Sequence, residues 1–181
     1  MDKKIDRRIL KSKNAIEESF LQLLEKKGFD SLSVKEIAEY ANIGRKTFYL
    51  HYDDLYDLLN HVLDKEMMEL STACGSKEVK DFTDGAISWF RYFERKRSFF
   101  TTLFVSNRTV VFRDRLLKLI MDDLERKAIN FGVDLDEIDS YFFGMAILGI
   151  VESMMLNHIK ADTEQIACRI GNLLEKNLLK Q

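Results

Sequence analysis

The chain has 181 residues, of which 46% are hydrophobic and 32% are charged. This composition suits a globular protein with a real core, close to the size at which one domain becomes two. Proline is absent and the eight glycines are scattered, so helices can run long and an all-helical (all-α) fold is expected. No window reaches the roughly 18 consecutive apolar residues of a membrane span, so we expect no membrane association and a cytoplasmic location.

Charge is divided unevenly along the chain. Residues 1–52 contain 11 Lys and Arg against 8 Asp and Glu, whereas residues 53–181 contain 17 against 22. A basic first part followed by an acidic remainder indicates that an anionic partner meets the amino-terminal end.

Metal-binding and catalytic patterns are missing from the sequence. Cys74 and Cys168 are too far apart for a Cys-x-x-Cys pair, and the three histidines, His51, His61 and His158, do not cluster. We find no glycine-rich phosphate loop and no nucleophile elbow. The sequence therefore predicts no metal, no cofactor and no enzymatic activity.

The amino-terminal part predicts three helices. Residues 12–27 carry apolar side chains at helical spacing, and Gly28 can end that helix in a left-handed turn. Ser33 and Glu36 form a capping box at the start of a second, short helix. The turn Asn-Ile-Gly at 42–44 then leads into a third. Two short helices joined by a tight turn behind a longer one outline a helix-turn-helix.

On a helical wheel, the third helix at 45–52 has two faces. Phe48 and Tyr52 point together toward a small core. After Gly44, the opposite face and its flanks carry Arg45, Lys46, Thr47, Tyr49, Leu50 and His51. Such a face suits the DNA major groove, because lysine can reach guanine O6 and N7 while a hydroxyl or leucine can meet a base edge. A solvated basic helix face fits the same residues, and the surrounding helix-turn-helix favours DNA.

Residues 31–59, SLSVKEIAEYANIGRKTFYLHYDDLYDLL, resemble the amino-terminal signature of the TetR/AcrR family of bacterial transcriptional regulators. Family members show a similar run of Ser/Thr-V-x-x-I-A, a turn, then T-x-Y-x-H/Y-F and an acidic-leucine helix start. The resemblance covers about residues 10–60. The later stretch SYFFGMAILGIVESMM, residues 140–155, is similar to the family's dimerisation bundle.

The resemblance implies a homodimer in which each head places its third helix in the major groove of a palindromic operator in double-stranded DNA. Residues 1–54 would form the DNA-binding head and residues 55–181 a ligand-binding and dimerisation body, connected by a fourth helix at about 54–73. In such proteins the counterparts of six residues commonly touch DNA, mainly its phosphates: Ser33, Arg45, Lys46, Thr47, Tyr49 and His51. Leu55 stands where many members carry a phosphate-binding lysine, which puts one backbone contact in doubt.

Periodicity predicts further helices at about 79–94, 98–105, 109–131, 136–159 and 163–180. The segment 141–156 is apolar almost all round with a single charge. Such a helix must be covered on several sides, by its own domain and by a second chain. We expect the dimer interface to use small and apolar residues of the last two helices, namely Gly144, Ile147, Val151, Met154, Leu173, Leu174 and Leu178.

The body is rich in aromatic residues, above all in the segment 86–104. Six aromatic or methionine side chains are candidates for lining an effector cavity: Trp89, Phe93, Phe100, Phe104, Met121 and Phe142. The same side chains also fit an ordinary packed core. We expect a small, mostly apolar effector in the body.

These observations together predict a sequence-specific DNA-binding transcriptional regulator that acts as a dimeric repressor released by a small hydrophobic effector. The alternative is a TetR-like protein–protein interaction module, a co-regulator whose head does not read DNA. The acidic body and the missing lysine would allow the alternative. The basic outward face of the third helix favours the regulator.

Overall fold

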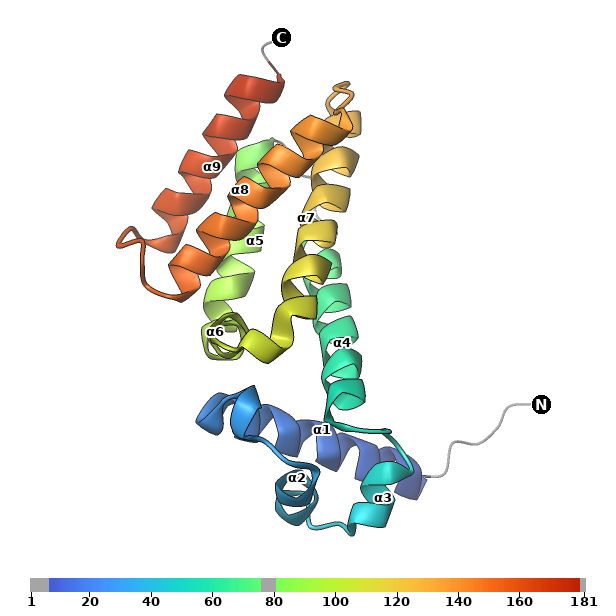
Figure 1. The fold of residues 1–181 in the computed structure, drawn as a ribbon. Coiled ribbons are helices and arrows are strands. Elements are labelled where there is room, and N and C mark those ends of the chain that lie inside the picture. Colours follow the sequence, from blue (N-terminus) through green and yellow to red (C-terminus); the bar gives the residue numbers. More distant parts are fainter. Residues whose placement is uncertain (1–6, 76–80, 180–181) are drawn as a thin grey trace, which may run out of the picture. The chain divides into compact units, whose positions relative to one another are not determined.

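The computed structural model describes residues 7–75 and 81–179, which are helical throughout their regular structure and contain no β-strand (Figure 1). The predicted all-α fold is confirmed. The chain divides into two compact units, Met1–Lys65 and Glu66–Gln181. The division falls inside helix α4 (Leu55–Gly75), which therefore contributes residues to both units.

The first unit is built around an apolar core at the meeting of α1, α2 and α3. Its elements are α1 (Arg7–Lys27), the 3-10 turn η1 (Phe29–Ser31), α2 (Val34–Tyr40), α3 (Arg45–Tyr49) and the first part of α4. Fully buried side chains from each element fill the core: Ile16, Phe20, Leu24, Phe29, Ile37, Phe48 and Leu58.

Local chemistry sets the helix ends of this unit. Gly28 adopts a φ of 76°, a conformation that favours glycine, and α1 ends before it as predicted. The Ser33 hydroxyl accepts the Glu36 backbone N–H at 3.3 Å and donates to the Glu36 carboxylate at 3.1 Å, which confirms the capping box. Helix α1 begins at Arg7 rather than at the predicted Ser12, and the Ser12 hydroxyl donates to the Arg8 carbonyl inside the helix instead of capping its start.

Asn42 makes the turn between α2 and α3. Its φ of 53° is left-handed, and the Ile43 N–H behind it donates to the Ala38 carbonyl at 2.9 Å. Asparagine tolerates this conformation better than other side chains do. The predicted tight turn is therefore confirmed, with Asn42 as the residue that reverses the chain.

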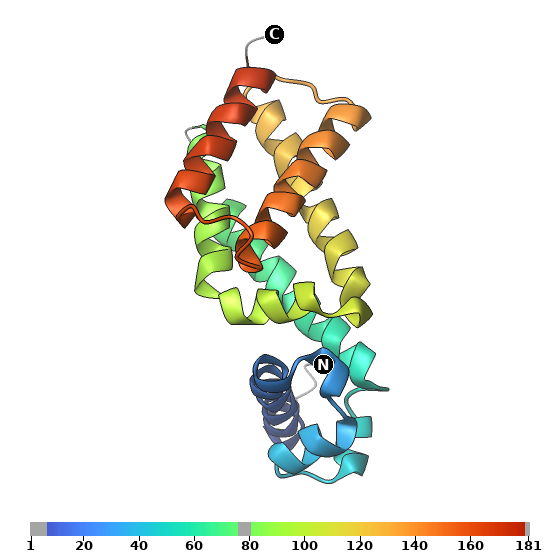
Figure 2. The same ribbon diagram turned by 60° about the vertical axis from the view of Figure 1, so that its left-hand side comes forward.

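The second unit is a bundle whose helices lie close to the predicted ranges. They are the end of α4, α5 (Phe82–Arg95), α6 (Arg97–Val105), α7 (Val110–Asn130), α8 (Glu137–Met155) and α9 (Thr163–Leu178), with the 3-10 turn η2 (Asn107–Thr109) before α7. Helix α5 packs mainly against α9, and α7 packs against α8. Helix α6 lies across one end of the bundle (Figures 1 and 2).

The contact between α5 and α9 depends on Gly171. A Cβ atom at this position would overlap the Thr83 backbone, so a larger residue would push the helices apart. One turn further along α9, the Glu175 carboxylate accepts both the Thr83 N–H at 3.1 Å and the Thr83 hydroxyl at 2.9 Å. Glycine and glutamate together fix the position of α9 on α5.

Helix α8 is long and apolar enough, by length and composition, to cross a membrane, in contrast to the expectation from the sequence. The core helix of a soluble helical bundle can have the same length and apolar composition. Seven residues of α8 are buried within the second unit, including Ile147, Val151 and Met154. Its apolar character is therefore explained in part by packing inside the bundle.

Candidate nucleic-acid interface

Helix α3 ends at Tyr49, earlier than the predicted 45–52, but the Tyr52 N–H still donates to the Phe48 carbonyl at 3.1 Å. The segment 45–52 therefore separates buried from exposed side chains as the helical wheel predicted. Phe48 and Tyr52 are 0% and 3% exposed, and their rings lie 5.9 Å apart in the core. On the other side, Leu50 is 82% and Tyr49 is 55% exposed. The Tyr49 ring packs edge-on against Phe48 at 5.5 Å, which holds the exposed tyrosine in place. The core residues thus fix the orientation of the outward side chains.

The outward surface, called here the α3 face, consists of Gly44, Arg45, Lys46, Thr47, Tyr49 and Leu50. Thr47 is half-buried and the other five are exposed. Within the described residues, neither Arg45 nor Lys46 is paired with a carboxylate. Both cations are consequently available to an anionic ligand such as a phosphate backbone.

Gly44 is the N-cap of α3, yet its backbone does not require glycine. Its φ is −74°, no side chain caps the helix, and a Cβ atom here would meet nothing within 4 Å. A side chain could therefore be accommodated in the free protein. Glycine at such a point suits a surface that must approach another molecule closely.

Ser33 lies at the start of α2, where its hydroxyl is engaged with Glu36. The Glu36 carboxylate also pairs with the Lys27 ammonium at 2.6 Å. The Lys27 ammonium and then the Ser33 hydroxyl hold the pKa of Glu36 below its ordinary value. Ser33 therefore has a structural role in the free protein, and its contact with DNA stays a prediction.

His51 joins the end of α3 to α1 rather than pointing freely outward. Its Nε2 lies 2.7 Å from the Ser12 hydroxyl, and the ring is half-buried. Burial, followed by the nearby Lys13 charge, lowers the pKa of His51 below its ordinary value of 6.5. The ring is thus neutral at pH 7, and it positions α3 on α1.

A buried carboxylate, Glu17 of α1, ties α3 and α4 together within the first unit. Glu17 is 8% exposed, and the Tyr52 hydroxyl donates to its Oε1 at 2.6 Å. The Lys65 ammonium of α4 donates to the other oxygen. His61 Nε2 lies 3.2 Å from Oε1 without the alignment of a hydrogen bond. Sequence reasoning missed Glu17, although it shares the apolar stripe of Phe20.

This cluster predicts an acid-sensitive head. Burial pushes the pKa of Glu17 up, but hydrogen bonds from Lys65 and Tyr52 outweigh burial and bring it below the ordinary 4.5. A lowered folded-state pKa stabilises the fold above the unfolded-state value, and that stability is lost as the pH falls through the folded-state value. We expect Glu17→Gln to reduce the unfolding free energy by about 1–2 kcal/mol at pH 7.

Urea unfolding of both proteins from pH 7 to pH 3 measures this effect. The difference between wild type and Glu17→Gln should shrink below about pH 4, because the wild-type carboxyl is then protonated as well. A difference that stays constant over the whole range would show that the Glu17 charge does not stabilise the head.

Comparison with known proteins identifies the family. Residues 20–62 match the model of bacterial regulatory proteins of the tetR family, and residues 80–176 match the model of a transcriptional regulator C-terminal region from the same family. The chain belongs to the TetR family. TetR-family members are DNA-binding transcriptional regulators that form dimers.

Two curated relatives are similar in sequence. The chain is 22% identical over 127 residues to the dhaKLM operon transcriptional activator DhaS of Lactococcus lactis, covering 67% of each protein. It is 33% identical over 70 residues to YxbF of Bacillus subtilis, an uncharacterized HTH-type transcriptional regulator, which covers 38% of the chain and 18% of that protein. The chain thus spans less than a fifth of YxbF.

Solved structures share the fold of this TetR-family protein. A TetR regulator from Streptococcus agalactiae superposes with a TM-score of 0.73 at 21% identity, covering 93% of this chain and 96% of that one. NalD, the secondary repressor of the MexAB-OprM multidrug efflux pump in Pseudomonas aeruginosa, gives 0.68 at 17% identity, covering 97% and 100%. Because TetR-family regulators are soluble, the apolar α8 is not evidence of a membrane segment.

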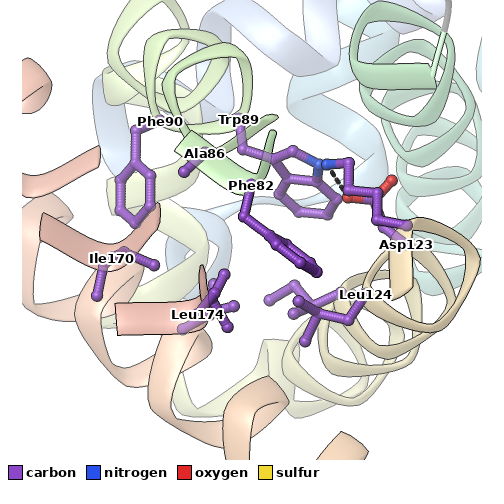
Figure 3. Close-up of a pocket in the computed structure, with 11 residues that line it drawn as sticks. Phe82, Ala86, Trp89, Phe90, Asp123, Leu124, Ile170 and Leu174 are labelled. Atoms are coloured by element: carbon purple, nitrogen blue, oxygen red, sulfur yellow. Dashed lines mark hydrogen bonds and ion pairs between the residues drawn. The ribbon is translucent and has the colours of Figure 1, made fainter. Parts of the chain in front are cut away.

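The body of this TetR-family protein holds a small cavity of about 30 Å³ between α5, α7, α8 and α9 (Figure 3). Of the six predicted effector residues, Trp89 lines this cavity. Phe93, Phe100 and Phe104 instead belong to a buried ring cluster, with 4.5 Å between the Phe93 and Phe100 centroids. In this structure these three phenylalanines pack in the core, and their contact with an effector stays a prediction.

The two remaining candidates lie away from the cavity. Met121 is half-buried, and a Cβ atom on Gly144 would come within 2.8 Å of its side chain, so it fills the contact between α7 and α8. Phe142 is 65% exposed on α8. Sequence reasoning missed two polar residues that do line the cavity, Asp123 and Lys127.

The structure divides the predicted interface residues of α8 and α9 into buried and exposed ones, and their part in a dimer stays a prediction. Six predicted interface residues are buried inside their own bundle: Gly144, Ile147, Val151, Met154, Leu174 and Leu178. Leu173 is exposed. A residue already covered by its own unit has little surface left for a partner. The exposed apolar side chains of α8, called here the open face, are Ile138, Tyr141, Phe142 and Met145.

Among residues 7–75 and 81–179, no group of three or more His, Cys, Asp or Glu side chains is placed to hold a metal ion. His51 and His61 of the first unit each contact other side chains, and Cys168 is a half-buried free thiol. The candidate sites among the described residues are therefore the α3 face and the body cavity.

Proposed function

We propose that this TetR-family regulator is a homodimer that binds a palindromic operator through the α3 face of each head. The observation that carries the proposal is the division of α3: Phe48 and Tyr52 lock one side into the core, while Arg45 and Lys46 lie unpaired on the other. An anchored helix with free cations can present the same side chains to DNA in every encounter.

The side chains of the α3 face fall into two groups, one directed at base edges and one at phosphates. Lys46, Thr47 and Leu50 point away from the core and would meet base edges, whereas Arg45 and Tyr49 on the flank would hold phosphates. Gly44 leaves the start of the helix uncovered, which permits close approach of the backbone. Ser33 and His51 act mainly by positioning α2 and α3, since both hydroxyl and ring are engaged within the head.

We place the dimer contact on the open face of α8, extended by Leu173 of α9. Its four members are between 44% and 78% exposed, an unusual density of large apolar side chains for a monomer surface. Gly149, further along α8, has no neighbour within 4 Å of a Cβ position, so another helix could pack closely there. Dimeric regulators bind half-sites about 34 Å apart, and this pairing would set that spacing.

Effector release is proposed to act through α4. Within the first unit Lys65 of α4 bonds to Glu17. Within the second unit, Glu66 and Glu69 of α4 accept hydrogen bonds from Lys96 at 2.6 and 2.7 Å. A small effector in the body that favours a shifted α4 by about 2.7 kcal/mol would weaken operator binding about a hundredfold.

We propose repression as the sign of regulation, because a dimer covering an operator excludes other proteins without further contacts. Similar proteins include an activator, DhaS, and a repressor, NalD. The α3 face would bind DNA in the same way in an activator and in a repressor. Leu55, at the position where many members carry lysine, is 8% exposed and belongs to the core. Its side chain therefore supplies no phosphate contact.

Selection of bound fragments from the genomic DNA of the source organism tests the proposal. We expect enrichment of a palindromic sequence whose affinity falls steeply with salt. If about six to ten phosphates are neutralised per dimer, log affinity should fall against log salt with a slope of about −5 to −9. Failure to enrich any sequence above background would favour the protein–protein interaction module instead.

A further inference from the structure

The body cavity contains a buried donor without a partner. Trp89 is 5% exposed, and its Nε1–H makes no hydrogen bond to any part of the chain that the structure describes. A buried N–H left unpaired is unfavourable, because it has lost its hydrogen bond to water without gaining another. Because Trp89 lines the cavity, an acceptor inside it can take a hydrogen bond from this N–H.

A buried ion pair lies at the same cavity. Asp123 and Lys127 are 5% and 7% exposed, and Lys127 Nζ donates to Asp123 Oδ2 at 2.5 Å. The other carboxylate oxygen accepts from Arg126. Each carboxylate oxygen is thus engaged by a cation, while the ammonium retains protons for another acceptor. The buried pair itself is neutral, and the Arg126 side chain beside it is half exposed.

Apolar side chains make up the rest of the lining. Figure 3 shows Trp89 and Asp123 toward one side of the cavity and Phe90, Ile170 and Leu174 toward the other. The cavity thus offers two donors, Trp89 Nε1 and Lys127 Nζ, with apolar surface facing them. This arrangement selects a ligand that has an oxygen acceptor at one end and a hydrocarbon group at the other.

We propose that the effector of this regulator is a small monocarboxylate whose carboxylate accepts hydrogen bonds from Trp89 Nε1 and Lys127 Nζ. The proposal rests on the proposed function, which places an effector in the body. A carboxylate suits a site whose donors include an ammonium, because charge-assisted bonds are stronger than those to a neutral carbonyl. A cavity of about 30 Å³ has room for about two water molecules, and therefore for two carboxylate oxygens.

The hydrocarbon end would lie against Phe82, Leu124 and Leu174, which also line the cavity. An alcohol or polyol fits less well, because a neutral hydroxyl oxygen accepts a weaker hydrogen bond from the Lys127 ammonium than a carboxylate oxygen does. The cavity holds little more than the carboxylate, so any chain must displace these apolar side chains, and a longer chain displaces more of them. Short chains are therefore preferred, and butyrate is the probe of choice.

The indole N–H of Trp89 gives a direct readout, because the chain has one tryptophan. In ¹H–¹⁵N spectra of the full-length protein, butyrate is expected to shift the single indole signal in a saturable manner. Butyramide keeps an oxygen acceptor but lacks the charge, and should bind at least about tenfold more weakly. Butan-1-ol, with neither charge nor carbonyl, should be weaker still.

Two variants assign the contacts, with butyrate binding measured by ligand-observed NMR. Trp89→Phe keeps a ring but removes the donor, and Lys127→Met keeps the stem but removes the charge. Each should weaken butyrate binding about tenfold or more. Lys118→Met removes an exposed charge from the same helix and should leave binding unchanged. If Lys127→Met fails to fold, Trp89→Phe still tests the donor.

An unshifted indole signal at saturating butyrate would overturn the proposal and show that the cavity holds water alone. Equal affinity for butyrate and butan-1-ol would overturn it too, since the charge would then play no part. Neither of these results bears on the selection of operator DNA, so the proposed DNA binding would be unaffected. Butyrate binding at Trp89 in a protein that selects no DNA would support the ligand site and refute the operator.

Discussion

Replacing Arg45 and Lys46 together by alanine is expected to weaken operator binding about a thousandfold or more. Each residue occurs once in each head of a dimer, so about four contacts are lost, and each is worth about 1 kcal/mol or more. The core is unaffected, because both side chains are exposed and lack partners among the described carboxylates. Fluorescence anisotropy with the selected operator at fixed salt measures the loss.

Single variants separate positioning from readout. Arg45→Ala and Tyr49→Phe should weaken binding to all sequences alike, whereas Lys46→Ala and Thr47→Ala should also relax the preference for particular bases. Lys118→Ala, an exposed charge of the body, is the matched control and should bind as wild type does. A double variant that binds the operator at full strength would remove α3 from the interface.

The second large effect is expected at the open face of α8. Ile138→Asp combined with Phe142→Asp should give a folded monomer, because both side chains are exposed in the single chain and are proposed to be covered only in the dimer. Operator affinity should fall by about a hundredfold or more, since the two heads no longer bind as one unit. Sedimentation velocity and circular dichroism report assembly and folding separately.

Val151→Asp provides the contrast within the same helix. Val151 is 1% exposed inside its own bundle, so a carboxylate there should unfold the body, at a cost of about 4 kcal/mol or more. A folded monomer from Val151→Asp, together with an intact dimer from the open-face double variant, would return the interface to the residues expected from the sequence alone.

The head was predictable because its decisive interactions are local. Ser33 and Glu36 are three residues apart, and the two faces of α3 follow from a spacing of four between Phe48 and Tyr52. Helical periodicity and capping rules act over such distances. The buried Glu17 escaped prediction because its partners, Tyr52 and Lys65, are distant in sequence and join it only in the folded head.

The body was predictable as a set of helices but not in the orientation of α8. A helix that is apolar almost all round has no preferred side, so the sequence could not distinguish Val151, which faces the bundle, from Phe142, which faces away. The burial of Asp123 and Lys127 could not be predicted from the sequence either. Their spacing of four is common on exposed helices, and only tertiary packing shows that this pair is buried.

Dimethyl sulfate footprinting of the selected operator tests most directly whether the α3 face reads DNA. If α3 lies in the major groove, guanine N7 positions should be protected in two patches about one helical turn, or 10–10.5 base pairs, apart. Protection should disappear with Arg45→Ala combined with Lys46→Ala. Unprotected guanines under saturating protein, or protection that survives the double variant, would contradict operator recognition by α3.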